Sequence, residues 1–356
     1  MTTRRASSNA LESIPLGIRE IARKLLDRSV VADAHGHPQA VVPGPVRRAA
    51  ERLADVPHDP LTSFSDGLVN LAIITAVGDP MGTVARPRSP LATVVKQLEA
   101  TRREAFTAGL PVATSVADIR PDSATRILLG IEGGDVVGDD PDCLPRLFDA
   151  GVRVIGLVHY ADNAIGTIGT SIVGRRGSRT VRAGSRSPGL TRLGVEIVTE
   201  MNRLGIVIDL AHADRSTTVD TCEQSTAPVI SSHTAAAALR DFPRYISDAE
   251  IEAIAATGGL IGLWPARVGS MAMTDLDDFA RHAQHLADLV GTEHICIGTD
   301  KNGVTAYAYG YRGSEDFVNL AAALLHVGFS TVDVEQIIGR NLHRVTASII
   351  EPATES

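Results

Sequence analysis

Eight short apolar runs, rich in β-branched residues, recur along this sequence, and helical patterns separate most of them. The runs span residues 29–35, 70–77, 126–133, 152–159, 206–212, 228–233, 259–265 and 294–300. Runs this apolar are typical of strands that are covered on both faces, as in parallel sheets. Eight strand–helix units therefore predict an α/β fold, a (β/α)8 TIM-like barrel.

Three segments carry helix signals. Residues 191–205 repeat apolar side chains at helical spacing and end at Gly205. Residues 247–259 begin at Ser247, the expected N-cap, and end in glycines. Residues 14–28 predict a further helix before the first strand.

These patterns divide the chain into an N-terminal helical extension over residues 1–28 and a barrel over residues 29–350. Long loops at 36–65 and 166–189 follow the first and fourth strands, and long loops on this face of a barrel usually have a function. The second loop contains five arginines among Gly and Ser. This loop is either a flexible, solvent-exposed segment or a mobile lid. A lid would attract an anionic substrate or contact a partner subunit.

Composition limits the classes of partner. The net charge of −8 disfavours general nucleic-acid binding. No apolar run approaches the ~20 residues that span a bilayer, and the first residues, MTTRRASSNALES, lack the apolar stretch of a signal peptide. The three cysteines are scattered and form no CxxC pair. We therefore expect a cytoplasmic protein without a nucleic-acid or membrane partner.

Several of the apolar runs end in histidine. The fifth run ends at His212 and the sixth at His233, so two neighbouring strands would place two imidazoles side by side. The first run leads to His35 and His37, and residues i and i+2 of a strand point the same way. Single histidines at such positions commonly bond only to loops, but the whole set indicates a metal site.

Two carboxylates join this set. Glu132 closes the third run between glycines, where a buried carboxylate is destabilising unless it is paired or ligated. Asp300 follows the eighth run and is either a catalytic group or a helix N-cap. Imidazole and carboxylate ligands suit zinc (Zn²⁺). Two zinc ions that share Glu132 would activate a water for attack on a carbonyl, and Asp300 would pass its proton to the leaving amine.

Longer stretches resemble the membrane dipeptidase family (renal dipeptidase, peptidase family M19) of the amidohydrolase-like superfamily. They are DAHGHP at 33–38, GIEGGD at 130–135, GVRVIGLVHYADN at 151–163, GLTRLGVEIVTEMNRLGIVIDLAH at 189–212, APVISSHTAAAAL at 227–239, PRYISDAEI at 243–251 and CIGTD at 296–300. The resemblance runs from about residue 30 to residue 345. It implies a TIM-like barrel, two zinc ions, hydrolysis of a dipeptide and, because members often form homodimers, a second copy as partner.

The resemblance also implies roles for single residues. His35 matches a ligand of one zinc ion, Glu132 the carboxylate that bridges both, and His212 and His233 the ligands of the other. Asp300 matches the catalytic aspartate.

Two further matches concern the substrate. His159, in LVHYADN, matches the histidine that stabilises the oxyanion, and we expect Asp162 and Asn163 to orient it. Arg244 matches the arginine that holds the substrate carboxylate, a role that suits the planar guanidinium fork.

The sequence departs from the family pattern at three places, which we expect to lie at the pocket mouth. The family has HxD where this chain has His37, so His37 either binds the metal, as in the wider superfamily, or leaves a one-zinc enzyme. Lys301 and Asn302 replace an aromatic residue and a second acid. Trp264 and Pro265 stand where the family has a tyrosine region.

Three hypotheses follow. The first is a zinc-dependent hydrolase of dipeptides or dipeptide-like amides. The second is a relative with altered chemistry that acts on a non-standard amide, lactam or peptide conjugate in a biosynthetic pathway, which the departures favour. The third is a barrel that binds a ligand without catalysis, which the retention of Glu132, His212, His233 and Asp300 disfavours.

Overall fold

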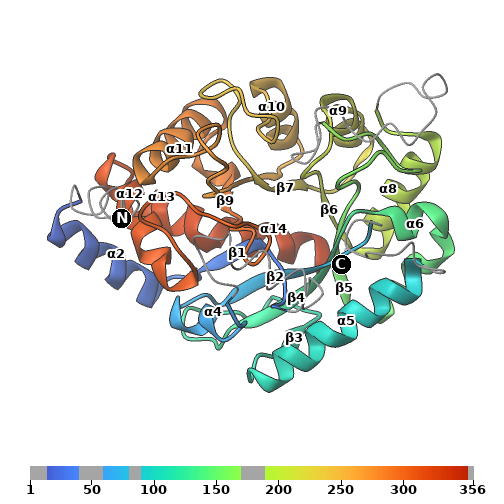
Figure 1. Ribbon diagram of the computed structural model, residues 1–356, viewed down its shortest axis with the longest axis horizontal. Coiled ribbons are helices and arrows are strands. Elements are labelled where there is room, and N and C mark those ends of the chain that lie inside the picture. The colour runs from blue at the N-terminus through green and yellow to red at the C-terminus, as the bar shows by residue number, and fades with distance from the viewer. Residues whose placement is uncertain (1–13, 40–58, 80–89, 170–188, 352–356) are drawn as a thin grey trace, which may run out of the picture.

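The computed structural model describes residues 14–39, 59–79, 90–169 and 189–351 (Figure 1). Most of the two predicted loops, including the arginine-rich part of 166–189, lies outside the described residues. Within the described part, no helix is both long enough and apolar enough to cross a membrane.

Eight parallel strands form a nearly closed barrel, which confirms the predicted fold. In order around the barrel they are β1 (Ala32–Gly36), β2 (Leu71–Val77), β4 (Arg126–Glu132), β5 (Val152–Gly156), β6 (Val207–Asp209), β7 (Val229–Thr234), β8 (Leu260–Leu263) and β9 (Ile295–Ile297). The ring is completed beyond the last strand, where the His37 N–H donates to the Lys301 carbonyl at 2.7 Å and the Asp300 N–H donates to the His35 carbonyl at 2.9 Å.

The sequence prediction differs from the barrel in two details. A two-residue strand, β3 (Val112–Ala113), pairs with β4 outside the ring and was not predicted. The strands β5, β6 and β9 each end three residues before the functional candidate that was expected to close them, namely His159, His212 and Asp300. These side chains therefore stand on the first turn of the loop beyond the sheet.

Helices surround the barrel (Figure 1). They are α2 (Leu16–Arg28), α4 (Ser63–Asp66), α5 (Pro90–Thr107), α6 (Asp135–Asp139), α7 (Leu144–Asp149), α8 (Arg192–Leu204), α9 (Arg215–Gln224), α10 (Asp248–Ala256), α11 (Leu276–Val290), α12 (Phe317–His326), α13 (Thr331–Glu335) and α14 (Asn341–Ile350). The shorter turns are η2 (Pro141–Cys143), η3 (Thr292–His294), η4 (Ser314–Asp316) and the π-helical η5 (Gln336–Arg340).

The predicted helix ends agree with the sequence signals. Thr191 accepts a hydrogen bond from the Gly194 N–H at the start of α8, and Gly205 ends this helix with φ 72°. Ser247 and Glu250 form a capping box at the start of α10. The helix expected at 14–28 is α2, which packs against α12 and α13.

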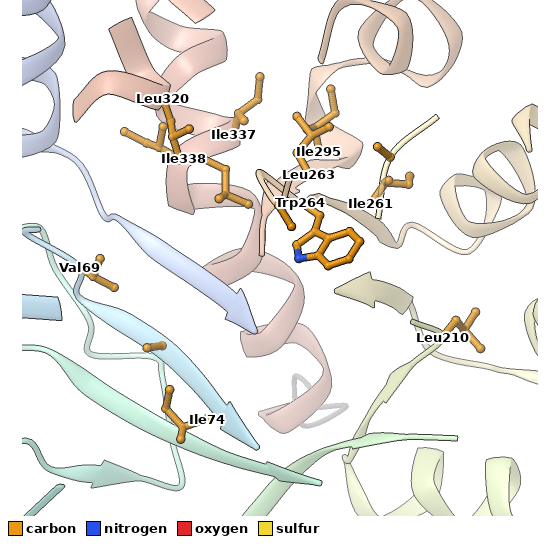
Figure 2. Packing of buried hydrophobic residues seen from close by; sticks show 14 of the residues in the cluster. Val69, Ile74, Leu210, Ile261, Leu263, Trp264, Ile295, Leu320, Ile337 and Ile338 are labelled. Atoms are coloured by element: carbon orange, nitrogen blue, oxygen red, sulfur yellow. The ribbon is translucent and has the colours of Figure 1, made fainter. Parts of the chain in front are cut away.

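Helix α14 closes the amino end of the barrel. Its Leu342, Val345 and Ile349 belong to one buried apolar cluster with interior strand residues such as Val207 and Ile230. A second, larger cluster fills the space between the strands and the outer helices, and Figure 2 shows part of it, with the Trp264 indole among the side chains of neighbouring strands. The opposite end of the barrel, where the strands end, is left to polar side chains.

Candidate metal centre

The carboxylate of Glu132 lies at the centre of the polar end of the barrel. It is the last residue of β4, and only 4% of it is exposed. Its Oε1 atom lies 3.0 Å from Nε2 of His212, 3.4 Å from Nε2 of His35 and 3.6 Å from Nε2 of His233. Strands β1 and β7 and the loop after β6 thus direct imidazoles at one carboxylate oxygen.

Two further imidazoles lie near the other carboxylate oxygen of Glu132. Oε2 lies 3.3 Å from Nε2 of His37 and 3.4 Å from Nε2 of His159. Nε2 of His37 lies 3.5 Å from Oδ1 of Asp300. The structure therefore brings together the five predicted metal ligands, His159 and Asp300.

These residues form two sets of three ligands that share Glu132, one with His35 and His37 and the other with His212 and His233. Within each set the ligand atoms lie within 4.8 Å of one another. The Nε2 atom of His35 is buried and makes no hydrogen bond within the described residues, although the carboxylate is near. A buried ring nitrogen without a hydrogen-bond partner, aimed at a carboxylate among other imidazoles, fits metal ligation.

Electrostatics divide the ligand histidines into two kinds. Burial lowers the pKa of His35, but Glu132 raises it more, so the pKa of His35 lies above its usual value. Burial lowers the pKa of His37, but Asp300 and Glu132 raise it more, to about 10. Burial, with neighbouring cationic groups that include Arg244, holds the pKa of His212 and His233 well below the usual value. His212 and His233 are therefore in the neutral form that binds metals, whereas His37 must first lose a proton.

The same carboxylate stays ionised. Burial raises the pKa of Glu132, but the imidazoles of His159, His35 and His212 together lower it well below the usual range. The centre therefore keeps a negative charge for a bound cation to neutralise.

Backbone strain is concentrated at this end of the barrel. Among the described residues four non-glycine positions have positive φ, and three of them are His212 (71°), Asp300 (55°) and Asn302 (64°). Left-handed backbone is unfavourable for such residues and is retained where the surroundings determine it. Here it turns the chain sharply after β6 and β9.

Asp79, which follows β2, is a site residue that the sequence analysis missed. Its Oδ2 atom lies 3.0 Å from Nδ1 of His159, although the ring N–H direction is not aligned for a hydrogen bond, and it accepts the Tyr160 N–H at 3.0 Å. The Asp162 carboxylate, which was expected to orient His159, accepts the Ile168 N–H. The sequence signal that could have identified it is the Gly78-Asp79 pair directly after the second apolar run.

The other predicted partner of His159, Asn163, stabilises the turn after β5. Its side chain donates to the Leu157 carbonyl at 2.8 Å and accepts the Ile165 N–H at 2.8 Å. Both residues thus fix the path of the loop that carries His159.

Arg244 lies beside the metal centre, in the loop before α10. It is buried, its Nη2 donates to the His233 carbonyl at 3.4 Å, and its guanidinium carbon lies 5.4 Å from the centre of the Trp264 ring. Its Nε has no hydrogen-bond partner within the described residues. Arg244 and His212 line a cavity of about 140 Å³, so a cation faces a space next to the imidazoles.

The residues of the three departures from the family pattern, which were expected at the pocket mouth, are buried and do not line this cavity. Lys301 Nζ donates to Ser63 Oγ at 2.6 Å and lies 3.3 Å from Oδ2 of Asp59. Asn302 donates to the His37 and Asp59 carbonyls, both at 3.0 Å. Lys301 and Asn302 therefore hold the segment before α4 against β1, and Trp264 is only 1% exposed within the wall of the site.

An α/β barrel with imidazoles and carboxylates gathered where the strands end belongs to the class of amidohydrolase-like barrels. Residues 19–355 match the family described as membrane dipeptidase (peptidase family M19). The chain therefore belongs to the membrane dipeptidase family, as the resemblance predicted.

Two curated relatives are named dipeptidases. Dipeptidase verJ of Clonostachys rogersoniana is 34% identical over 225 residues, which cover 63% of this chain and 55% of that protein. An uncharacterized dipeptidase of Schizosaccharomyces pombe is 30% identical over 237 residues, 65% of this chain and 55% of that protein. The matches thus span little more than half the length of these relatives.

Solved structures share the fold at low identity. The probable dipeptidase PvdM of Pseudomonas aeruginosa has a TM-score of 0.78 at 18% identity, over 95% of this chain and 100% of that one. A metallo peptidase of Rhodobacter sphaeroides, liganded with a phosphinate mimic of the dipeptide L-Ala-D-Ala, has a TM-score of 0.75 at 20% identity, over 90% of this chain and 99% of that one.

Proposed function

We propose that this protein is a zinc-dependent hydrolase of dipeptides or dipeptide-like amides. The position of Glu132 carries the proposal, because one carboxylate lies between two sets of histidine ligands at the end of the barrel. Family membership supports it.

Two zinc ions would be held by these sets, the first by His35, His37 and Glu132 and the second by Glu132, His212 and His233. When bound, zinc lowers the pKa of a water and polarises the carbonyl under attack. A single zinc ion remains the alternative, with His37 as the weaker ligand.

The remaining residues would carry protons and substrate. Asp300 takes a proton from the attacking water and returns it to the leaving amine. His159 donates a hydrogen bond to the oxygen on which negative charge develops. Arg244, beside the cavity, would bind the terminal carboxylate of the substrate.

A second candidate is hydrolysis of a non-standard amide, lactam or peptide conjugate. The observation that favours it is His37, which supplies an imidazole where the family has a carboxylate and so changes the charge of the centre by one.

The test is to incubate the zinc-loaded chain with L-L dipeptides, L-D dipeptides and non-peptide amides. We expect turnover of at least one dipeptide, and an Asp300→Asn variant that retains zinc but is at least ~10²-fold slower. Turnover of non-peptide amides alone would favour the second candidate. A chain that binds zinc and turns over nothing would contradict both.

Two further expectations accompany this proposal. Cys143, Cys222 and Cys296 are all free, which is compatible with a reducing cytoplasm and can be tested by cell fractionation. A homodimer is expected from the family and can be tested by light scattering after size-exclusion chromatography.

A further inference from the structure

We propose that Ser232, held by Asp209, fixes the tautomer of one histidine in each of the two metal-ligand sets and so supports both zinc sites. The inference rests on the proposed metal centre. It assigns positioning roles to two residues that touch neither the metals nor the substrate.

The Ser232 hydroxyl lies at a junction of buried polar groups. Its Oγ is 2.5 Å from Oδ2 of Asp209, 2.9 Å from Nδ1 of His233 and 3.4 Å from Nδ1 of His35. All four side chains are almost completely buried, the most exposed being Asp209 at 3%. Water therefore does not compete for these contacts.

A count of hydrogens fixes the direction of each bond. A serine hydroxyl has one hydrogen and two lone pairs. The short contact to Asp209 is that of a hydroxyl that donates to a carboxylate, which leaves only lone pairs for the two imidazoles. His35 and His233 then both donate Nδ1–H to Ser232, and the neutral form of each ring presents its Nε2 lone pair to the metal centre.

Asp209 is itself fixed. Its Oδ1 accepts the Ala211 N–H at 3.0 Å and the Ser232 N–H at 2.9 Å. Asp209, His35 and His233 also form a third set of residues with metal-ligand spacing. The Ser232 hydroxyl bonds to all three members, so hydrogen bonding satisfies this set without an ion.

The effect on both sites follows from which set each histidine belongs to. His35 belongs to the set with His37, and His233 belongs to the set with His212. One hydroxyl thus orients a ligand of each zinc ion. Residues that orient metal-bound histidines typically contribute about 10- to 100-fold to metal affinity, so loss of Ser232 should weaken both sites together.

The experiment is zinc titration of the metal-depleted full chain against a competing chelator, with cobalt absorption spectra as a second report on each site. For Ser232→Ala we expect both zinc affinities to fall by about 10- to 100-fold. Ser231→Ala is the matched control, because Ser231 Oγ is buried on the same strand and has no hydrogen-bond partner within the described residues. It should bind zinc like the wild-type chain.

Thr75→Val supplies a single-site comparison. Thr75 Oγ1 and the Thr75 carbonyl oxygen both lie 3.2 Å from Nδ1 of His37, a ligand of one set only. Valine keeps the carbonyl, so at most one zinc affinity should fall, and by less than in Ser232→Ala. Should Ser232→Ala not fold, Asp209→Asn replaces it. The amide of Asp209→Asn would donate to Ser232 Oγ and occupy one of its two lone pairs. Only one lone pair would then remain for His35 and His233, so at least one zinc site must weaken.

The proposal is overturned if Ser232→Ala binds both ions with wild-type affinity, if it weakens one site alone, or if the wild-type chain binds a single ion. Because no substrate is used, this outcome is independent of the test for dipeptide hydrolysis. A chain in which Ser232→Ala weakens both zinc sites, but which has no dipeptidase activity, would contradict the proposed function and leave this inference standing.

Discussion

At the scale of single residues, His159 stands between two carboxylates. Its Nε2 faces Glu132 and its Nδ1 faces Asp79. Burial raises the pKa of Asp79, but His159 and the Tyr160 N–H lower it below its usual value, so Asp79 is ionised beside the ring. A negative charge there favours a ring N–H at Nδ1 and so fixes which nitrogen faces the substrate.

We therefore expect Asp79→Asn to lower kcat and leave KM nearly unchanged, because the change acts on the orientation of His159. The loss should be smaller than the about 10²- to 10³-fold loss expected for His159→Ala. Steady-state kinetics on the best dipeptide of the panel measures both. The control is Asp162→Asn, since an amide oxygen can still accept the Ile168 N–H. Equal losses in Asp79→Asn and Asp162→Asn would contradict the assignment.

At the scale of elements, apolar runs and cap residues predicted the strands and helices well because both depend on local sequence. The contacts of Lys301 were not predictable in this way. Lys301 and Asp59 lie far apart in the sequence, and the side chain is directed toward Ser63 instead of the metal centre. Asp79 was missed for the same reason, since only the folded barrel places β2 beside the loop after β5.

A glycine at the end of α8 gives a sharp test at this scale. Gly205 and Gly109 both have φ 72°, but a Cβ at Gly205 would lie 2.8 Å from the Ile349 carbonyl of α14, whereas Gly109 has open space. Alanine at either position adds backbone strain of about 1–2 kcal/mol. Urea unfolding should show a larger loss for Gly205→Ala than for Gly109→Ala, because only the former displaces the helix that closes the barrel. Equal losses would mean that α14 moves freely.

At the scale of the whole molecule, the sequence could predict that functional side chains meet at one end, because parallel strands bring their carboxyl ends together. It could not predict how protons are shared there. The sharing of protons depends on distances between side chains that are remote in the chain. One example is the 3.3 Å between Nε2 of His37 and Oε2 of Glu132. One result of these short distances is the raised pKa of His37, which determines how strongly bound zinc stabilises the barrel at each pH.

Zinc should stabilise the folded protein more at high pH than at low pH. The proposed ligands come from β1, β4 and the ends of β6 and β7, so bound zinc cross-links the barrel, and it stabilises by about 2.7 kcal/mol per site at a free concentration of 100 Kd. With a pKa of about 10, His37 is protonated in the metal-free protein at neutral pH, and zinc must displace that proton. Each pH unit below this pKa then lowers the apparent affinity about tenfold, or about 1.4 kcal/mol of stabilisation.

Thermal unfolding at pH 6, 7 and 8, with buffered free zinc and with chelator, measures this difference. We expect the difference in Tm between the zinc-bound and the chelated protein to widen as pH rises. The far-UV circular dichroism spectrum of the chelated protein should remain that of a folded protein, because the apolar clusters do not depend on the metal. His37→Asp is the discriminating variant. A carboxylate among the remaining imidazoles is already ionised over this range, so zinc displaces no proton from it and the difference in Tm should change less with pH. A wild-type difference that is constant from pH 6 to pH 8 would show that His37 does not release a proton on binding, and would favour the one-zinc centre without His37 as a ligand.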